Sequence, residues 1–166
     1  MAEILLTYFG LAGSNLKPDM RQIAVRETFA WLLANRKDAL AARALTVDDR
    51  VGEGVKVKAD PEYLERVLGA VIDNAICFSN AGGEIVLDAV PHNGKTRISV
   101  ADAGKGIAPE DLKNIFKAFE LEPEKRRPAG FGLSLPLAAI LVNALGGKLW
   151  AESPGPGMGA VFYLEL

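Results

Sequence analysis

The stretch Val100-Ala-Asp-Ala-Gly-Lys-Gly-Ile107 forms the end of a predicted strand and an Asp-x-Gly-x-Gly turn that follows it. Asp102 follows the apolar strand Ile98-Ser-Val100, so its carboxylate is expected at the mouth of the core. A half-buried carboxylate in that place needs hydrogen-bond donors. Gly104 and Gly106 have no Cβ, which allows another group to approach the backbone closely. A plain Asp-x-Gly turn is the alternative interpretation.

Two further elements flank this turn in the sequence. Asp73-Asn74 lies upstream, and Gly130-Phe-Gly132 lies downstream, just before a predicted helix. Asn74 offers a neutral oxygen that suits Mg²⁺, a cation that relies on substrate phosphates for its other ligands. Asp73 can orient or deprotonate a hydroxyl or a water. The first N–H groups of the helix can hold phosphate oxygens, so the three elements together predict a nucleotide site with Asp102 accepting from an adenine amine.

Each flanking element also has a plainer interpretation. The Asp73-Asn74 pair can be a solvated helix face, and the second glycine pair can be a simple joint between a loop and a helix. The basic run 125–127 can neutralise phosphates, but charge runs of this kind also occur on solvated loops. Phe116 and Phe119 are expected to be core contacts of a short helix.

The helix predicted over residues 61–78 carries the first of these elements. Asp60 and Pro61 suit its start, because an aspartate caps free N–H groups and a proline fits the first helical position. One face is an apolar stripe that is expected to pack on a sheet; it consists of Leu64, Val67, Leu68, Val71, Ile72, Ala75 and Ile76. The other face holds Arg66, Gly69, Ala70, Asp73, Asn74 and Cys77.

The remaining pattern predicts an alternation of helices and strands. We expect a long helix over 20–44, strands over 46–51 and 55–58, and a hairpin of strands 84–90 and 96–101 joined at 91–94. A short helix over 109–119, a helix over 134–145 and final strands over 148–152 and 160–166 complete the order. Helices and a largely antiparallel sheet in this order predict a two-layer α/β sandwich.

Composition limits the classes of partner. The chain has 166 residues, is 49% hydrophobic and carries a formal net charge of −2, which gives no reason to expect a nucleic-acid or membrane surface. Cys77 and His92 are the only residues of their types, so a thiolate or imidazole metal site is excluded by count. His92 is expected to be an exposed loop residue. The apolar run 4–12 is too short for a membrane helix, and a cytoplasmic location is expected.

Together these motifs resemble the ATP-binding catalytic domain of bacterial sensor histidine kinases, within the Bergerat-fold ATPase superfamily, over residues 16–166. Residues 64–79 are similar to the family's asparagine box, 102–107 to its first glycine box, 115–119 to its phenylalanine box, and 130–135 to its second glycine box. The resemblance implies a mixed, largely antiparallel sheet of about five strands covered on one face by three helices. Residues 1–15 look like the tail of a preceding dimerisation and phosphoacceptor helix.

The resemblance also implies roles for particular residues. Asp73 would be the catalytic base, and Asn74 would bind Mg²⁺ and the nucleotide. The remaining ATP-binding residues would be Asp102, Gly104, Gly106, Ile107, Gly130, Gly132 and Leu133. The implied reaction passes the γ-phosphoryl group of ATP to a histidine on a separate phosphoacceptor domain, with a response regulator downstream.

The chain departs from the family pattern at the metal-phosphate end. The family usually has asparagine at the position of Ala70 and a basic residue at that of Cys77, and the loop from 120 to 129 is short for its ATP lid. No His-Glu phosphoacceptor motif occurs in the chain, so it is not expected to autophosphorylate alone. A degenerate adaptor with weak or no ATP binding, or a related ATPase or serine kinase, is the alternative.

Overall fold

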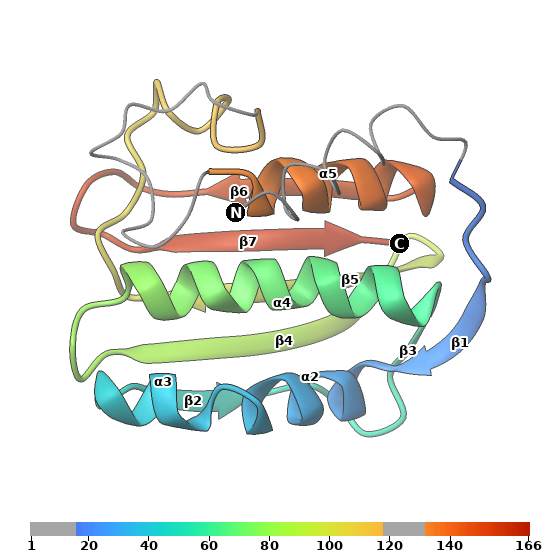
Figure 1. Cartoon of the computed structure of the whole chain (residues 1–166), viewed down its shortest axis with the longest axis horizontal. Coiled ribbons are helices and arrows are strands. Elements are labelled where there is room, and N and C mark those ends of the chain that lie inside the picture. Colours follow the sequence, from blue (N-terminus) through green and yellow to red (C-terminus); the bar gives the residue numbers. More distant parts are fainter. Residues whose placement is uncertain (1–15, 118–131) are drawn as a thin grey trace.

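The computed structural model describes residues 16–117 and 132–166. Its elements are β1 (Arg21–Ala24), α2 (Val25–Ala34), α3 (Lys37–Ala42), β2 (Thr46–Asp49), β3 (Lys56–Ala59), α4 (Pro61–Phe78), β4 (Glu84–His92), β5 (Lys95–Asp102), α5 (Ser134–Ala144), β6 (Lys148–Glu152) and β7 (Ala160–Glu165). Figure 1 shows two layers, with α2, α4 and α5 lying side by side over one face of the sheet. The predicted α/β sandwich is therefore confirmed.

The main sheet has five strands in the order β2-β4-β5-β7-β6. Strand β2 runs parallel to β4, and the other neighbours are antiparallel. Strands β1 and β3 form a separate two-stranded antiparallel sheet. The predicted mixed, largely antiparallel sheet is thus confirmed. Strand β5 is central and pairs along its whole length, which fixes where its last residue, Asp102, lies.

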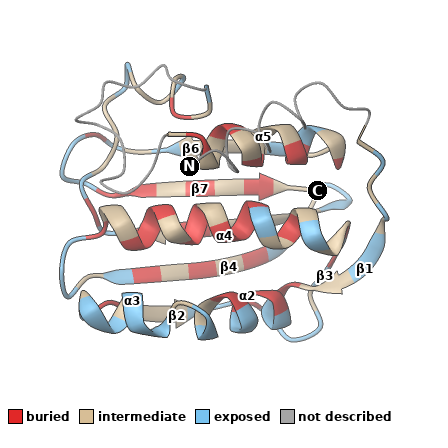
Figure 2. Cartoon of the chain, viewed as in Figure 1, coloured by how far each residue is buried: buried red, intermediate tan, exposed pale blue. Residues whose placement is uncertain are grey.

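Helix α4 and the sheet face it covers make up the centre of the core. The Asp60 carboxylate accepts a hydrogen bond from the Tyr63 N–H at 3.2 Å and caps the helix, and Pro61 follows as its first residue. The whole predicted apolar stripe of α4 is buried (Figure 2). Burying each of these large aliphatic side chains stabilises the fold by about 2 kcal/mol.

Strand β5 alternates between buried and half-buried residues, as expected for a strand covered on one face. Ile98 and Val100 are each 1% exposed, and Asp102 at 9% is the next residue of the same inward row. Because side chains alternate faces along a strand, all three point toward the helices. The carboxylate therefore lies at the edge of the core, as the sequence predicts.

The prediction of one long helix over 20–44 is wrong. Residues 21–24 form β1, with Ile23 opposite Val57 in β3, and the helical part is broken between α2 and α3. The Val25 N–H also donates to the Val55 carbonyl at 3.1 Å. The pairing of β1 with β3, more than thirty positions away, outweighs the local preference for a helix. That preference is weak, because the spacing of a few apolar residues does not distinguish well between helix and strand.

Two smaller predictions also need correction. Residues 109–117 form successive hydrogen-bonded turns and not a helix, although Phe116 does contact the core, with its ring edge-to-face on Phe162 at 6.3 Å. His92 is not a loop residue: it ends β4, half-exposed, with its Nε2 3.9 Å from a Glu165 oxygen. The hairpin turn consists of Asn93 and Gly94 alone, both at positive φ.

Some sequence-based predictions lie outside the described residues. They are the tail segment 1–15, Phe119, Gly130 and most of the loop before α5. Among the helices of 16–117 and 132–166, none combines the length and the apolar character that crossing a bilayer requires.

Candidate functional site

A cavity of about 320 Å³ opens where β5 ends, between α4, residues 105–115 and β7. Its walls are mainly apolar, and its polar side chains include Asn74, Asp102 and Lys105. The apolar lining residues are Phe78, Ile107, Ala108, Ile115, Leu135, Pro156, Ala160 and Phe162. Apolar walls with a few convergent polar groups are typical of small-molecule sites.

Asp102 is a buried polar residue of this cavity. Its Oδ1 accepts a hydrogen bond from the Gly104 N–H at 3.0 Å, and the Ala160 N–H also donates to the carboxylate. Burial raises the pKa of the Asp102 carboxyl to about 6, although these two N–H groups act to lower it. An acid in this setting can accept a further hydrogen bond from a ligand, and a flat ring with an exocyclic amine fits both the acid and the apolar walls.

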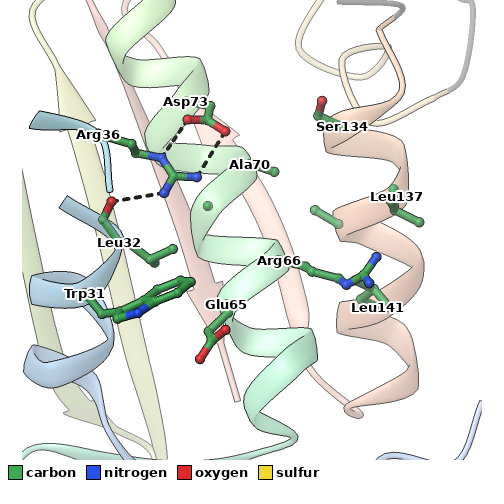
Figure 3. A pocket seen from close by; sticks show the side chains of 12 residues that line it. Trp31, Leu32, Arg36, Glu65, Arg66, Ala70, Asp73, Ser134, Leu137 and Leu141 are labelled. Atoms are coloured by element: carbon green, nitrogen blue, oxygen red, sulfur yellow. Dashed lines mark hydrogen bonds and ion pairs between the residues drawn. The ribbon is translucent and has the colours of Figure 1, made fainter. Parts of the chain in front are cut away.

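Asn74 shares this cavity, whereas Asp73 does not. The Asn74 side chain projects from α4 into the cavity and is 8% exposed. Asp73 precedes it by one residue, which corresponds to a rotation of about 100° around the helix. It lines a second cavity of about 380 Å³ between α2, α4 and α5, together with Ala70 and Ser134 (Figure 3). The structure therefore places Asn74 with Asp102 and separates Asp73 from them.

The two glycines after Asp102 are required by contacts within the protein. A Cβ on Gly104 would lie 2.2 Å from the Phe78 carbonyl oxygen, which also accepts from the Lys105 N–H. Gly106 has a φ of +65°, and a Cβ there would lie 2.0 Å from the Gly155 carbonyl oxygen. The absence of a Cβ thus allows this turn to pack on the end of α4 and on the loop before β7. Gly106 and Ile107 also line the cavity.

The second glycine box reaches the same cavity through a residue that sequence reasoning missed. Gly132 has a φ of +67°, and Leu133 is buried at the N-cap position of α5. Leucine has no polar group with which to cap the first N–H groups of the helix. The lining residue is Leu135, two positions further on. The inward row of β7, which includes Ala160 and Phe162, was also missed, although its alternating pattern is visible in the sequence.

The part of the chain that lines this cavity is similar in sequence to known proteins. The sequence model for histidine kinase-, DNA gyrase B- and HSP90-like ATPases matches residues 59–166, from α4 to the last strand. The chain belongs to this family. Within the ATPase family, it is 34% identical over 132 residues to the adaptive-response sensory kinase SasA of Crocosphaera subtropica, covering 78% of this chain and 34% of that protein.

Solved structures of the ATPase family share its fold. Full-length ShkA in complex with AMPPNP matches with a TM-score of 0.86 and 24% identity, over 98% of this chain and 34% of that one. Histidine kinase ThkA in complex with the response regulator TrrA matches with a TM-score of 0.80 and 21% identity, over 99% and 46% of the chains. The chain spans about a third of the length of SasA.

Proposed function

We propose that this domain binds ATP in the cavity at Asp102 and passes the γ-phosphoryl group to a histidine on a separate domain. The observation that supports this most directly is the pairing of a buried Asp102 carboxylate and a buried Asn74 amide in one apolar-walled cavity. The carboxylate suits the adenine amine, and the ring would lie between apolar walls. Family membership and the AMPPNP complex of the structural neighbour ShkA support the same ligand.

The phosphate end of the proposed site depends on few protein groups. Asn74 would hold Mg²⁺ together with the nucleotide's own phosphates, since Mg²⁺ needs only one or two protein ligands. Lys105 lines the cavity and is exposed, so its ammonium is available to phosphates. When bound, the cation would supply positive charge that neutralises the phosphates during transfer. Ala70 and Cys77 contribute no oxygen or cationic group here.

The role of Asp73 as a base remains a prediction from the resemblance. The base would have to reach the acceptor histidine beside the transferred phosphoryl group. Asp73 lies on the side of α4 that faces α2, and both of its carboxylate oxygens accept hydrogen bonds from Arg36, at 2.6 and 3.2 Å. A role for Asp73 other than proton abstraction is argued below.

The acceptor histidine is proposed to lie on another domain. His92 is the only histidine of the chain, and Asp102 pairs with Ile85 at the opposite end of β4. His92 lies seven positions further along β4 than Ile85, which corresponds to about 23 Å. His92 therefore lies at the end of β4 that points away from the proposed adenine position. A dimerisation and phosphoacceptor domain and a downstream response regulator are therefore the proposed partners, as the ThkA–TrrA complex suggests for a structural neighbour.

Replacing Asn74 by alanine is expected to weaken binding of AMPPNP about tenfold or more in the presence of Mg²⁺, and by less than about threefold in its absence, because only the metal contact is lost. Calorimetric titration with and without Mg²⁺ measures both values. Asn143→Ala, an exposed amide on α5, is the control and should bind as the wild type does. A wild-type protein that binds no AMPPNP would favour the degenerate adaptor.

Adenosine binding is expected to weaken as the pH falls through about 6. Above this value Asp102 is ionised and accepts strongly from the adenine amine; below it the carboxyl is protonated and accepts only weakly. We expect a dissociation constant that is constant between pH 7 and 8 and about tenfold higher at pH 5. Adenosine is the probe because none of its groups titrates in this range. A dissociation constant that does not change between pH 5 and 8 would contradict the role of Asp102.

A further inference from the structure

One arginine connects the first helical segment to the helix that carries Asn74. Arg36 stands between α2 and α3, at the N-cap position of α3, and its side chain crosses to α4 (Figure 3). Its Nε donates to one Asp73 oxygen at 2.6 Å and its Nη2 to the other at 3.2 Å. Its Nη1 donates to the Leu32 carbonyl at 3.0 Å, in the last turn of α2. We call this arrangement the Arg36–Asp73 clamp.

The surface of α4 is shaped to receive this guanidinium. A Cβ on Gly69 would lie 3.0 Å from Arg36 Nη2, so a larger residue there would force the guanidinium to move. The Arg36 side chain is 19% exposed and the Asp73 side chain 37%. A forked, partly buried arginine–carboxylate pair is more specific in geometry and stronger than an exposed one. Removing one partner leaves the other charge poorly compensated.

We infer that Arg36 is a positioning residue of the nucleotide site, and that Asp73 is its anchor on α4. The clamp holds the turn of α4 whose next residue is Asn74, and it keeps Asp73 on the side that faces α2. Both Asp73 oxygens accept hydrogen bonds from Arg36. This inference rests on the proposed function and assigns to Asp73 a part different from the one implied by the resemblance.

The test is a double-mutant cycle on nucleotide affinity. The variants are Arg36→Ala, Asp73→Ala and the two together, titrated with AMPPNP with and without Mg²⁺. We expect each single variant to bind AMPPNP about tenfold less tightly in the presence of Mg²⁺. The affinity of the double variant should be no more than about twofold lower than that of the single variant that binds less tightly. If Asp73 acted only as the catalytic base, its removal would leave the affinity for AMPPNP unchanged. Wild-type affinity in either single variant, or losses that multiply in the double variant, would overturn the inference.

Matched controls separate positioning from general destabilisation. Arg66 also lines the second cavity, and its exposed ion pair with Glu62 lies within a single turn of α4. The variant Arg66→Ala should therefore bind AMPPNP as tightly as the wild type does. Arg36→Lys keeps the charge without the forked geometry and should give an intermediate loss. If Arg36→Ala does not fold, the affinity of Arg36→Lys for AMPPNP tests the inference instead. An affinity equal to that of the wild type would overturn it.

A second measurement does not depend on nucleotide. The side-chain amide resonance of Asn74 is recorded by NMR in the nucleotide-free protein. It should shift or broaden in Arg36→Ala and stay in place in Arg66→Ala, and an unchanged resonance in Arg36→Ala would overturn the inference. If the wild type bound no AMPPNP, the proposed function would fail, and this resonance alone would decide whether Arg36 positions Asn74.

Discussion

Asp102→Asn is expected to lower the affinity of the protein for AMPPNP by about a hundredfold or more. The substitution keeps the size of the side chain but removes the negative charge, and it places an NH₂ group where an acceptor faces the adenine amine. A buried hydrogen bond to a charged acceptor is replaced by an unsatisfied or opposed contact, which costs several kcal/mol. Calorimetric titration with and without Mg²⁺ measures the loss, which should be the same in both conditions.

The control for this prediction is the stability of the variant. The pKa of Asp102 is raised from 3.8 to about 6 in the folded protein, so burial of its ionised form destabilises the fold above pH 6 and has no effect below pH 3.8. At pH 7 Asp102→Asn is therefore expected to be more stable than the wild type, by on the order of 2 kcal/mol. A stable variant with undiminished affinity would show that adenine does not bind at Asp102.

Gly104→Ala is expected to destabilise the protein by about 3 kcal/mol or more. Its Cβ would lie 2.2 Å from the Phe78 carbonyl oxygen and 2.6 Å from Asp102 Oδ1, so either the end of α4 or the turn itself must move. Both contacts involve groups fixed by packing, and overpacking at such a place is costly. Urea denaturation monitored by circular dichroism measures the change in the free energy of unfolding.

Gly54→Ala provides the comparison for Gly104→Ala. Gly54 has a φ of +73°, and no atom outside residues 53–55 lies within 4 Å of the place that a Cβ would take, so only the cost of the left-handed conformation remains. That cost is about 1 kcal/mol. Equal losses in the two variants would show that the contact with the end of α4 does not explain why residue 104 is a glycine.

The fold and the position of Asp102 could be predicted because their signals are local. Periodicity identified α4 and its buried stripe, turn residues identified the hairpin, and alternation along β5 placed Asp102 at the edge of the core. The helix over 20–44 could not be predicted correctly, because β1 exists through its pairing with β3. The alternation along β7 is visible in the sequence, but it does not show that Phe162 and Leu135 lie in one cavity, because they join it from elements distant in sequence.

The sequence by itself determined the order of the motifs, the two-layer fold and the residue types at the proposed adenine end. Spacing and turn chemistry act over a few residues and can be recognised in a single chain. Only the tertiary structure decided which neighbours those residues have. Arg36 and Asp73 lie 37 positions apart, and they form a pair because α2 packs beside α4. One residue along a helix changes the direction of a side chain by about 100°, and this places Asn74 in the cavity and Asp73 outside it.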